Sequence, residues 1–217
     1  MNIRRAVLFD LDGTLLDTLD DLADATNAAL AELGLPQHPT GAYKYFVGDG
    51  FEQLVRRAIG EEHLTEALLA RGIELARCEY ARCWAEKTQP YPGIPELLDE
   101  LGRRGIPMAV FSNKPHEFTR LCVTRLLSHW RFRVIQGAVP ELARKPDPGG
   151  ALAIAAGMGL APGEVLYLGD TNTDMQTAAA AKMFAVGALW GFRTADELLA
   201  AGAAVLAATP LDILQWL

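Results

Sequence analysis

Short, continuously apolar runs are the feature of this sequence that most limits the folds it can adopt. They lie at residues 5–10, 106–112, 132–137, 164–170 and 183–189, with a further candidate at 203–209. Runs without polar alternation are typical of strands that are buried on both faces of a parallel sheet. Helical patterns such as "PELLDELGRRG" (95–105) lie between the runs. This alternation predicts an α/β fold with a doubly wound, mostly parallel sheet and a Rossmann-like core.

One long interval breaks the alternation. From about Asp17 to Lys87 no convincing strand pattern is present, and apolar residues recur at helical spacing. The expected helical stripes are Leu19, Leu22, Thr26, Ala29, Leu30 and Leu33; Phe51, Leu54, Val55, Ala58 and Ile59; and Leu64, Ala67, Leu68 and Leu75. We therefore expect residues 1–16 and 88–217 to form the α/β core. Residues 17–87 are expected to form an inserted α-helical cap subdomain, followed by a stiff connector at 89–95.

Composition excludes several classes of protein. The 217 residues are 50% hydrophobic and 22% charged, as in a globular chain, and the formal net charge is −7. The absence of a dense basic block argues against nucleic-acid or anionic-membrane partners. The first apolar run ends at Asp10, which is too early for a signal peptide or a membrane span. We expect a cytoplasmic monomer or homodimer.

Cysteine usage agrees with a reducing compartment. The chain has three cysteines, Cys78, Cys83 and Cys122, and an odd number without a close pair argues against a disulfide framework. We expect buried thiols.

Polar clusters follow four of the predicted strands. They are "DLDGT" with Asp10, Asp12 and Thr14; "FSNKP" with Ser112 and Asn113; "RKPDP" with Lys145; and "LGDTNTD" with Asp170 and Asp174. The carboxyl ends of parallel strands meet at one edge of a sheet, where α/β proteins bind their ligands. Each cluster alone has an ordinary explanation as a helix N-cap, a turn or a surface charge. Together they would converge on one crevice.

The chemistry of these clusters favours a metal ion and a phosphoryl group. Asp10 and Asp12 repel each other unless a cation lies between them or one is protonated. Carboxylate oxygens with open space between them suit Mg²⁺, whereas hydroxyl, backbone N–H and lysine groups suit phosphoryl oxygens. "DTNTDM" fails as a calcium loop, because Met175 and Ala181 stand where that loop requires glycine and glutamate. "VGDG" lacks the third glycine of a dinucleotide fingerprint.

The motifs "DLDGTLLDT", "SNKP", "KPDP" and "GDTNTD", in this order, resemble those of the haloacid dehalogenase-like hydrolases. The resemblance covers essentially the whole chain. Within that superfamily, "YPGIPELLDELGRRGIPMAVFSNKP", "VGDG" and "WGF" are most similar to the phosphoglycolate phosphatase-like family.

The resemblance implies a Mg²⁺-dependent phosphatase and a role for each matching residue. Asp10 would be the nucleophile that forms an aspartyl-phosphate, and Asp12 would be the general acid and base. Lys145 would stabilise the nucleophile and the transferring group. Substrate oxygens would be held, or the loop ordered, by Thr14, Ser112 and Asn113. Mg²⁺ would be bound by Asp10, the backbone carbonyl of Asp12 and Asp170, with Asp174 as a ligand through water or as support.

The resemblance points to a small phosphorylated metabolite, 2-phosphoglycolate first, as substrate. A sugar-phosphate mutase (β-phosphoglucomutase-like) is the alternative, and a phospho-aspartate signalling receiver or an inactive binding relative are further alternatives. Asp49 is expected to cap the helix that follows it. Lys44, Arg56 and Arg57 are the cap cations that could meet a substrate carboxylate, and the sequence does not choose among them.

Overall fold

The main sheet has six parallel strands in the order β5-β4-β1-β6-β7-β8. The computed structural model describes residues 4–217. The strands are β1 (Ala6–Phe9), β4 (Met108–Pro115), β5 (Phe132–Ala138), β6 (Val165–Gly169), β7 (Phe184–Ala188) and β8 (Val205–Ala207). The predicted parallel sheet is confirmed, including the strand within 203–209. The chain order reverses at β1, so the crevice of a doubly wound sheet lies beyond β1, β4 and β6.

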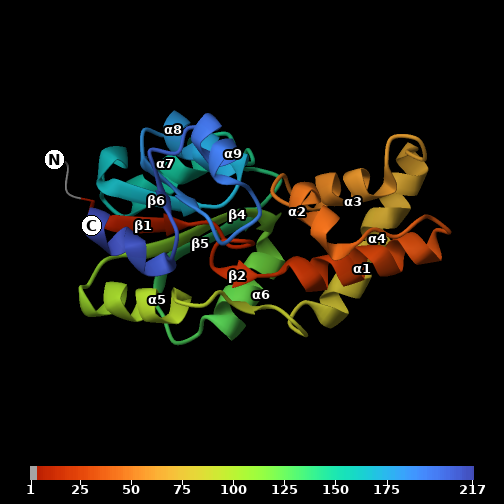
Figure 1. Ribbon diagram of the computed structural model, residues 1–217, viewed down its shortest axis with the longest axis horizontal. Coiled ribbons are helices and arrows are strands. Elements are labelled where there is room, and N and C mark those ends of the chain that lie inside the picture. Colours follow the sequence, from red (N-terminus) through yellow and green to blue (C-terminus); the bar gives the residue numbers. More distant parts are fainter. Residues whose placement is uncertain (1–3) are drawn as a thin grey trace.

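Helices cover both faces of this sheet (Figure 1). One face packs against α5 (Ile94–Arg103), α6 (His116–Leu126) and the short helix η3 (Pro210–Trp216); the other packs against α7 (Gly149–Gly157), α8 (Asn172–Ala180) and α9 (Ala195–Ala200). Strand β1 shows the division, because successive side chains of a strand point to opposite faces. Val7 and Phe9 join the first core, whereas Leu8 joins the second. Burial on both faces explains why the strand sequences are continuously apolar.

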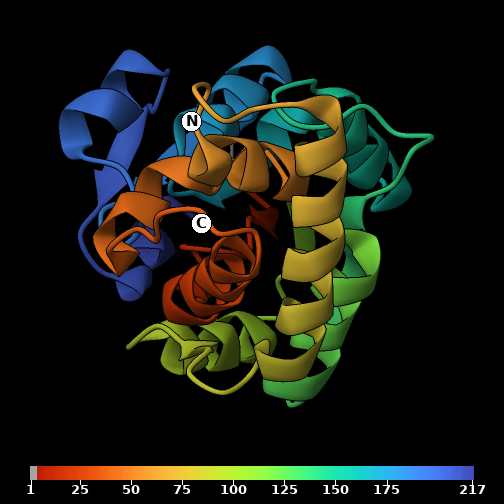
Figure 2. The ribbon, with the colours of Figure 1, turned by 90° about the vertical axis from the view of Figure 1, so that its right-hand side faces the viewer.

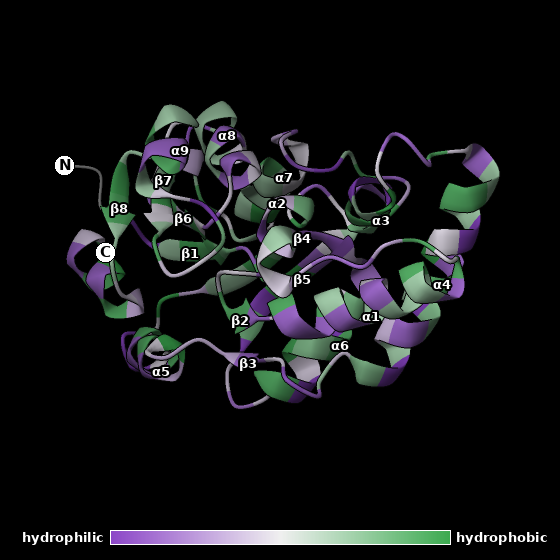
Figure 3. Ribbon diagram, turned by 45° about the vertical axis from the view of Figure 1, so that its right-hand side comes forward, coloured by the Kyte–Doolittle hydropathy of each residue, from purple (hydrophilic) through white to green (hydrophobic). Residues whose placement is uncertain are grey.

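The segment that follows Asp10 and Asp12, up to residue 88, is mainly helical. It contains α1 (Leu19–Glu32), η1 (Thr40–Ala42), α2 (Tyr43–Phe46), α3 (Phe51–Ile59) and α4 (Glu66–Cys83). These helices lie together beyond the carboxyl ends of the sheet strands (Figures 1 and 2). They share a core of their own, and α1 and α4 carry both hydrophobic and hydrophilic residues along their length (Figure 3).

Two of the predicted helical stripes match α1 and α3, but the third was partly wrong. Leu64 lies before α4, and Ala67 is exposed. Thr65 caps the helix through a hydrogen bond from the Leu68 backbone N–H (3.1 Å), so the helix starts after Leu64 and its buried face starts at Leu69. That face consists of Leu69, Gly72, Leu75, Ala76 and Tyr80.

The two ends of the helical segment are held together. Strand β2 (Leu16–Asp17) pairs in antiparallel fashion with β3 (Gln89–Pro90). Beside this pair, the buried carboxylate of Asp21 accepts hydrogen bonds from the Lys87 N–H (3.0 Å), the Thr88 N–H (2.8 Å) and the Thr88 hydroxyl (2.7 Å). Three donors on one buried carboxylate fix where the chain leaves the sheet and where it returns.

The cysteines differ in burial. Cys122 is buried as predicted, whereas Cys83 is partly buried and Cys78 is exposed. The prediction was wrong for Cys78 because it lies on the outer side of α4, away from the face that packs on α1 and α3. Over the described range, no helix has the length and apolar character needed to cross a bilayer.

Candidate active site

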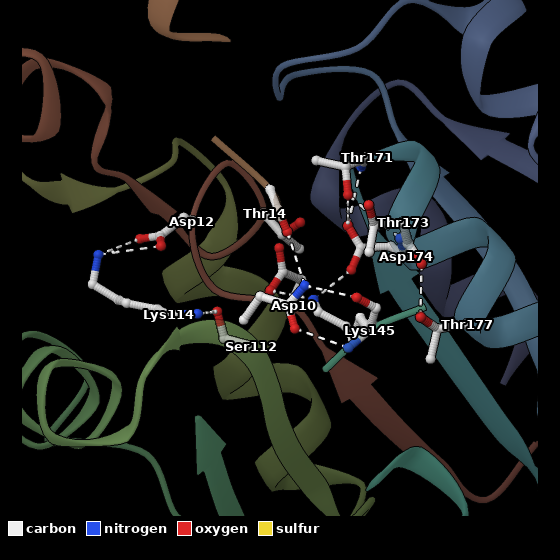
Figure 4. Close-up of polar contacts among 12 residues, drawn as sticks. Asp10, Asp12, Thr14, Ser112, Lys114, Lys145, Thr171, Thr173, Asp174 and Thr177 are labelled. Atoms are coloured by element: carbon white, nitrogen blue, oxygen red, sulfur yellow. Dashed lines mark hydrogen bonds and ion pairs between the residues drawn. The ribbon is translucent and has the colours of Figure 1, made fainter. Parts of the chain in front are cut away.

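The polar clusters predicted from sequence meet at the carboxyl ends of the central strands. Asp10 directly follows β1 and Asp170 directly follows β6, and these strands are neighbours. Ser112 and Asn113 lie near the end of β4, on the other side of β1. Lys145 lies in the loop between β5 and α7. Figure 4 shows Ser112 and Lys145 near Asp10.

Three carboxylates form the centre of the site. Asp10, Asp170 and Asp174 are buried, and each offers an oxygen within 4.8 Å of the others. The turn that follows Asp10 allows this approach, because Gly13 has a φ of +87° and a Cβ there would overlap the Asp170 carboxylate. Asp12 does not point into the cluster, so any contribution it makes there comes from its backbone, as the resemblance implied.

Lys145 is the cation of this cluster. Its Nζ atom lies 2.8 Å from Oδ1 of Asp10 and 2.6 Å from Oδ1 of Asp174. Burial alone lowers the pKa of the Lys145 ammonium, but the charges of Asp10 and Asp174 outweigh it and raise that pKa well above its ordinary value. The surface-charge interpretation of Lys145 is therefore excluded by its burial.

The two aspartates on the β6 side are held by different donors. Asp170 accepts from the Thr14 hydroxyl (2.8 Å) and the Phe192 backbone N–H (2.9 Å). Asp174 lies in the first turn of α8 and accepts from the Thr171 N–H (3.0 Å) and hydroxyl (2.6 Å) as well as from Lys145. Asp174 accepts four contacts, counting the Tyr167 hydroxyl at 3.3 Å, against two for Asp170, so its position favours a supporting role over direct ligation.

The electrostatics of the cluster favour a cation. Burial and, after it, the charge of Asp174 raise the pKa of Asp10 from 3.8 to about 7, although Lys145 opposes both effects. Burial and the same neighbours raise the pKa of Asp170 well above its ordinary value. Three buried carboxylates facing a single ammonium are under-compensated, and a hard divalent cation would relieve their repulsion. The donor set therefore fits Mg²⁺.

Lys114 is a site residue that sequence reasoning missed. Its Nζ atom lies 2.9 Å and 3.1 Å from the two carboxylate oxygens of Asp12, on the side away from Lys145 (Figure 4). It also lies 4.6 Å from the centroid of the Tyr80 ring of α4. Burial lowers the pKa of Lys114, but the charge of Asp12 reverses this effect and the pKa is raised. The available signal was a lysine within a continuously buried strand, which requires a buried counter-charge.

Ser112 and Asn113 lie at the site but are engaged with the protein. The Asn113 amide accepts from the Lys145 N–H (2.9 Å) and donates to the Lys145 carbonyl and to the Gly48 carbonyl (both 3.0 Å). The Ser112 hydroxyl accepts from the Lys114 N–H at 3.2 Å. Asn113 thus orders the loop that carries Lys145 and ties it to the helical segment.

The helical segment encloses the site. A small cavity of about 30 Å³ lies between the sheet edge and the segment. Its lining residues are Asp10, Asp12, Leu22, Val47, Gly48, Gly50, Phe51, Leu54, Ser112, Asn113, Lys114 and Pro115. Such a space holds about two water molecules.

The expectation that Asp49 caps the helix after it was wrong. Gly50 takes the N-cap position of α3 with a φ of +97°. That backbone directs the Asp49 carboxylate to α8, where it accepts from the Thr173 hydroxyl (2.7 Å), and it also pairs with Arg57. These contacts lower the pKa of Asp49 despite partial burial. Asp49 therefore joins the helical segment to the core.

Comparison with known proteins identifies the family to which the chain belongs. A model of the haloacid dehalogenase-like hydrolases matches residues 7–188. The chain therefore belongs to the haloacid dehalogenase-like hydrolase family.

Its relatives define the group within that family. The chain is 37% identical over 192 residues to the phosphoglycolate phosphatase of Pseudomonas putida, covering 87% of this chain and 70% of the relative. It is 33% identical over 197 residues to that of Yersinia pestis, covering 89% and 84%. The crystal structure of a predicted phosphoglycolate phosphatase from Haemophilus somnus superposes with a TM-score of 0.88 at 27% identity, covering 98% and 97%. The chain is thus a phosphatase of the phosphoglycolate phosphatase-like group.

Proposed function

We propose that this chain is a Mg²⁺-dependent phosphomonoesterase that works through an aspartyl-phosphate on Asp10. Its substrate is a small phosphorylated metabolite, with 2-phosphoglycolate as the first candidate, and it acts in the cytoplasm. The observation that carries the proposal is the position of Asp10, between the Lys145 ammonium and a carboxylate cluster suited to a divalent cation.

Asp10, Asp170 and the backbone carbonyl of Asp12 would hold Mg²⁺, and Asp174 would support them. When bound, the ion would offset the negative charge of the substrate phosphate and of Asp10. That repulsion is worth about 4 kcal/mol for two unit charges 4 Å apart in a moderately screened site. Lys145 acts in the same direction, because its ammonium already touches the Asp10 carboxylate.

Asp10 forms a bond to phosphorus while the bond to the leaving-group oxygen breaks, and Asp12 supplies the proton that this oxygen needs. Water then attacks the phosphorus, Asp12 accepts its proton, and Asp10 is released as a carboxylate together with inorganic phosphate. The Lys114 ammonium contacts both carboxylate oxygens of Asp12 and so positions the group that exchanges this proton. Proton donation in the first step requires this contact to open.

We also propose that residues 17–87 act as a cap. The cavity beside Asp10 is too small for a phosphate ester with its leaving group, so the helices must move away for substrate to bind and close again afterwards. Closure would exclude bulk water from the aspartyl-phosphate. The contacts of Asp49 with Thr173 and of Asn113 with Gly48 are the ones that must break on opening.

The direct test is to trap the phosphorylated enzyme. We expect the wild-type chain with Mg²⁺ to release inorganic phosphate from 2-phosphoglycolate, and EDTA to stop the reaction until Mg²⁺ is restored. Acid quenching followed by mass spectrometry should place one phosphoryl group on Asp10, and Asp10→Asn should abolish both signals. Turnover that needs a sugar bisphosphate and releases little phosphate would identify a mutase instead. Full activity of Asp10→Asn, or indifference to EDTA, would contradict the mechanism.

A further inference from the structure

A second cavity adjoins the catalytic one. It has a volume of about 420 Å³ and lies between α3 and α4 of the helical segment and the loop that follows β5. Phe51, Asn113 and Pro115 line both cavities, so the two share a wall. The second cavity is also lined by Arg77 and Arg144, against a single acidic residue, Glu52.

Arg144 is an exposed residue that lines the second cavity, next to the wall that the two cavities share. It immediately precedes Lys145 in the chain, and a Cβ placed on Gly50 would be 3.0 Å from its Nη1 atom. Gly50 lines the catalytic cavity, so the guanidinium packs against the backbone that closes that cavity. Within the described residues 4–217, the Arg144 side chain makes neither an ion pair nor a hydrogen bond.

Several other cations near the site already have carboxylate partners. Lys145 pairs with Asp10, Lys114 with Asp12, and Arg57 with Asp49. Two weaker pairs involve exposed side chains, at 3.9 Å between Arg56 and Glu52 and at 3.6 Å between Arg77 and Glu117. Of the cap cations singled out from the sequence, Arg57 is therefore occupied.

We propose that the second cavity receives the leaving group of the substrate and that Arg144 binds a carboxylate on it. This inference rests on the proposed phosphatase function and deepens it. A guanidinium presents a planar pair of N–H donors that matches a carboxylate, and its single positive charge balances the single negative charge of that group. On a chain of net charge −7, an unpaired guanidinium beside the site is also the group that attracts an anionic ester to it.

The volume extends the substrate class beyond glycolate. A cavity of about 420 Å³ is within the range of small-molecule sites, which is more than a two-carbon acid fills. We therefore expect longer phosphorylated hydroxy acids to be accepted as well, provided that they carry a carboxylate. Neutral esters lack the partner for Arg144.

The test compares two esters of similar size, 2-phosphoglycolate and ethyl phosphate, in wild type and in Arg144→Gln. A hydrogen-bonded charged partner contributes about 1.5–3 kcal/mol, so kcat/KM for 2-phosphoglycolate should fall about 10- to 100-fold, mainly through KM. Ethyl phosphate should stay within about twofold, and Arg144→Lys should recover part of the loss. Arg133→Gln is the matched control, because Arg133 is exposed beside Pro107 at the opposite ends of the strands.

Two kinetic results would overturn the inference. Equal losses for both esters would mean that Arg144 supports Lys145 rather than a carboxylate, and no loss for either would mean that the guanidinium contacts no substrate. Failure of the wild type to hydrolyse any phosphomonoester would instead reject the proposed function. The inference then still has its own test, because calorimetric titration of Asp10→Asn with the two esters compares the same affinities without turnover. Equal affinities for the two esters, or an affinity for 2-phosphoglycolate unchanged by Arg144→Gln, would also overturn it.

Discussion

The Nζ atom of Lys145 lies 2.6 Å from Oδ1 of Asp174, which joins the loop after β5 to the first turn of α8. The same ammonium lies 2.8 Å from Asp10, so one cation links parts of the chain that are 135 residues apart. Both carboxylates are buried from solvent. This contact determines how the nucleophile and the supporting carboxylate are placed relative to each other.

Lys145→Ala should therefore slow catalysis strongly. Removing the ammonium takes away the positive charge that faces the transferring phosphoryl group, and loss of one such donor costs about 2.7–4 kcal/mol. We expect kcat to fall about 100- to 1000-fold. Steady-state kinetics with 2-phosphoglycolate would measure it. Lys87→Ala is the control, since Lys87 forms an exposed pair with Asp24 and its loss should leave kcat unchanged. Near-normal kcat in Lys145→Ala would contradict the role.

The ion pair of Lys114 and Asp12 makes a prediction about stability. Lys114→Gln leaves a buried carboxylate without its counter-charge, which typically costs about 3–5 kcal/mol. The double variant Asp12→Asn, Lys114→Gln removes both charges and should recover most of that loss. Urea unfolding of the wild type, the two single variants and the double variant would measure the coupling. Additive effects would show that the two side chains do not depend on each other. The double variant should remain inactive, because Asp12 is then unable to exchange protons.

The sheet could be predicted from the sequence because its strands are buried on both faces. The strand at 165–169 carries no charged residue, and Asp170 stands at its end in the structure. The same pattern predicted that the aspartates would converge, since parallel strands end at one edge. The helical segment was predicted less well: the third stripe started at Leu64, because the sequence does not show that Thr65 is the N-cap of α4.

Pairings between distant side chains were beyond sequence reasoning. Lys114 is part of the motif "FSNKP", yet only the fold places its ammonium 2.9 Å from the carboxylate of Asp12, a residue 102 positions earlier. Asp49 looked like a helix cap because local spacing is all that a sequence shows. Its actual partner, Thr173, lies on a helix of the core. The unpaired state of Arg144 depends on the positions of every nearby carboxylate, so it also required the structure.

The turn at Gly13 predicts a link between backbone shape and metal binding. In Gly13→Ala the added Cβ would overlap the Asp170 carboxylate and approach the Phe192 ring to 2.8 Å, so Asp170 must move. We expect at least a tenfold weaker affinity for Mg²⁺, measured by calorimetry. Gly34→Ala is a matched control: its φ is +71°, so the backbone strain is similar, but no atom lies within 4 Å of the new Cβ. Equal Mg²⁺ affinity in the two variants would argue against Asp170 as a ligand.

The raised pKa of Asp10 predicts how stability depends on pH. Burial raises this pKa from 3.8 to about 7, so between these values the native state of the metal-free protein binds more protons than the unfolded state. Stability rises with pH only where the unfolded state binds more protons, so the free energy of unfolding should fall as pH rises from about 4 to about 7. Asp170 acts in the same direction.

Mg²⁺ should reverse this loss, because it binds the ionised carboxylates and protons compete with it. At a concentration 100 times its Kd, a ligand stabilises by about 2.7 kcal/mol, so the rise in Tm on adding Mg²⁺ should be several degrees near pH 8 and small near pH 5. Differential scanning calorimetry with Mg²⁺ or EDTA would measure both values. Asp10→Asn removes the titrating carboxylate and should flatten the decline between pH 4 and 7. An equal dependence of stability on pH in the metal-free wild type and in Asp10→Asn would contradict the raised pKa of Asp10.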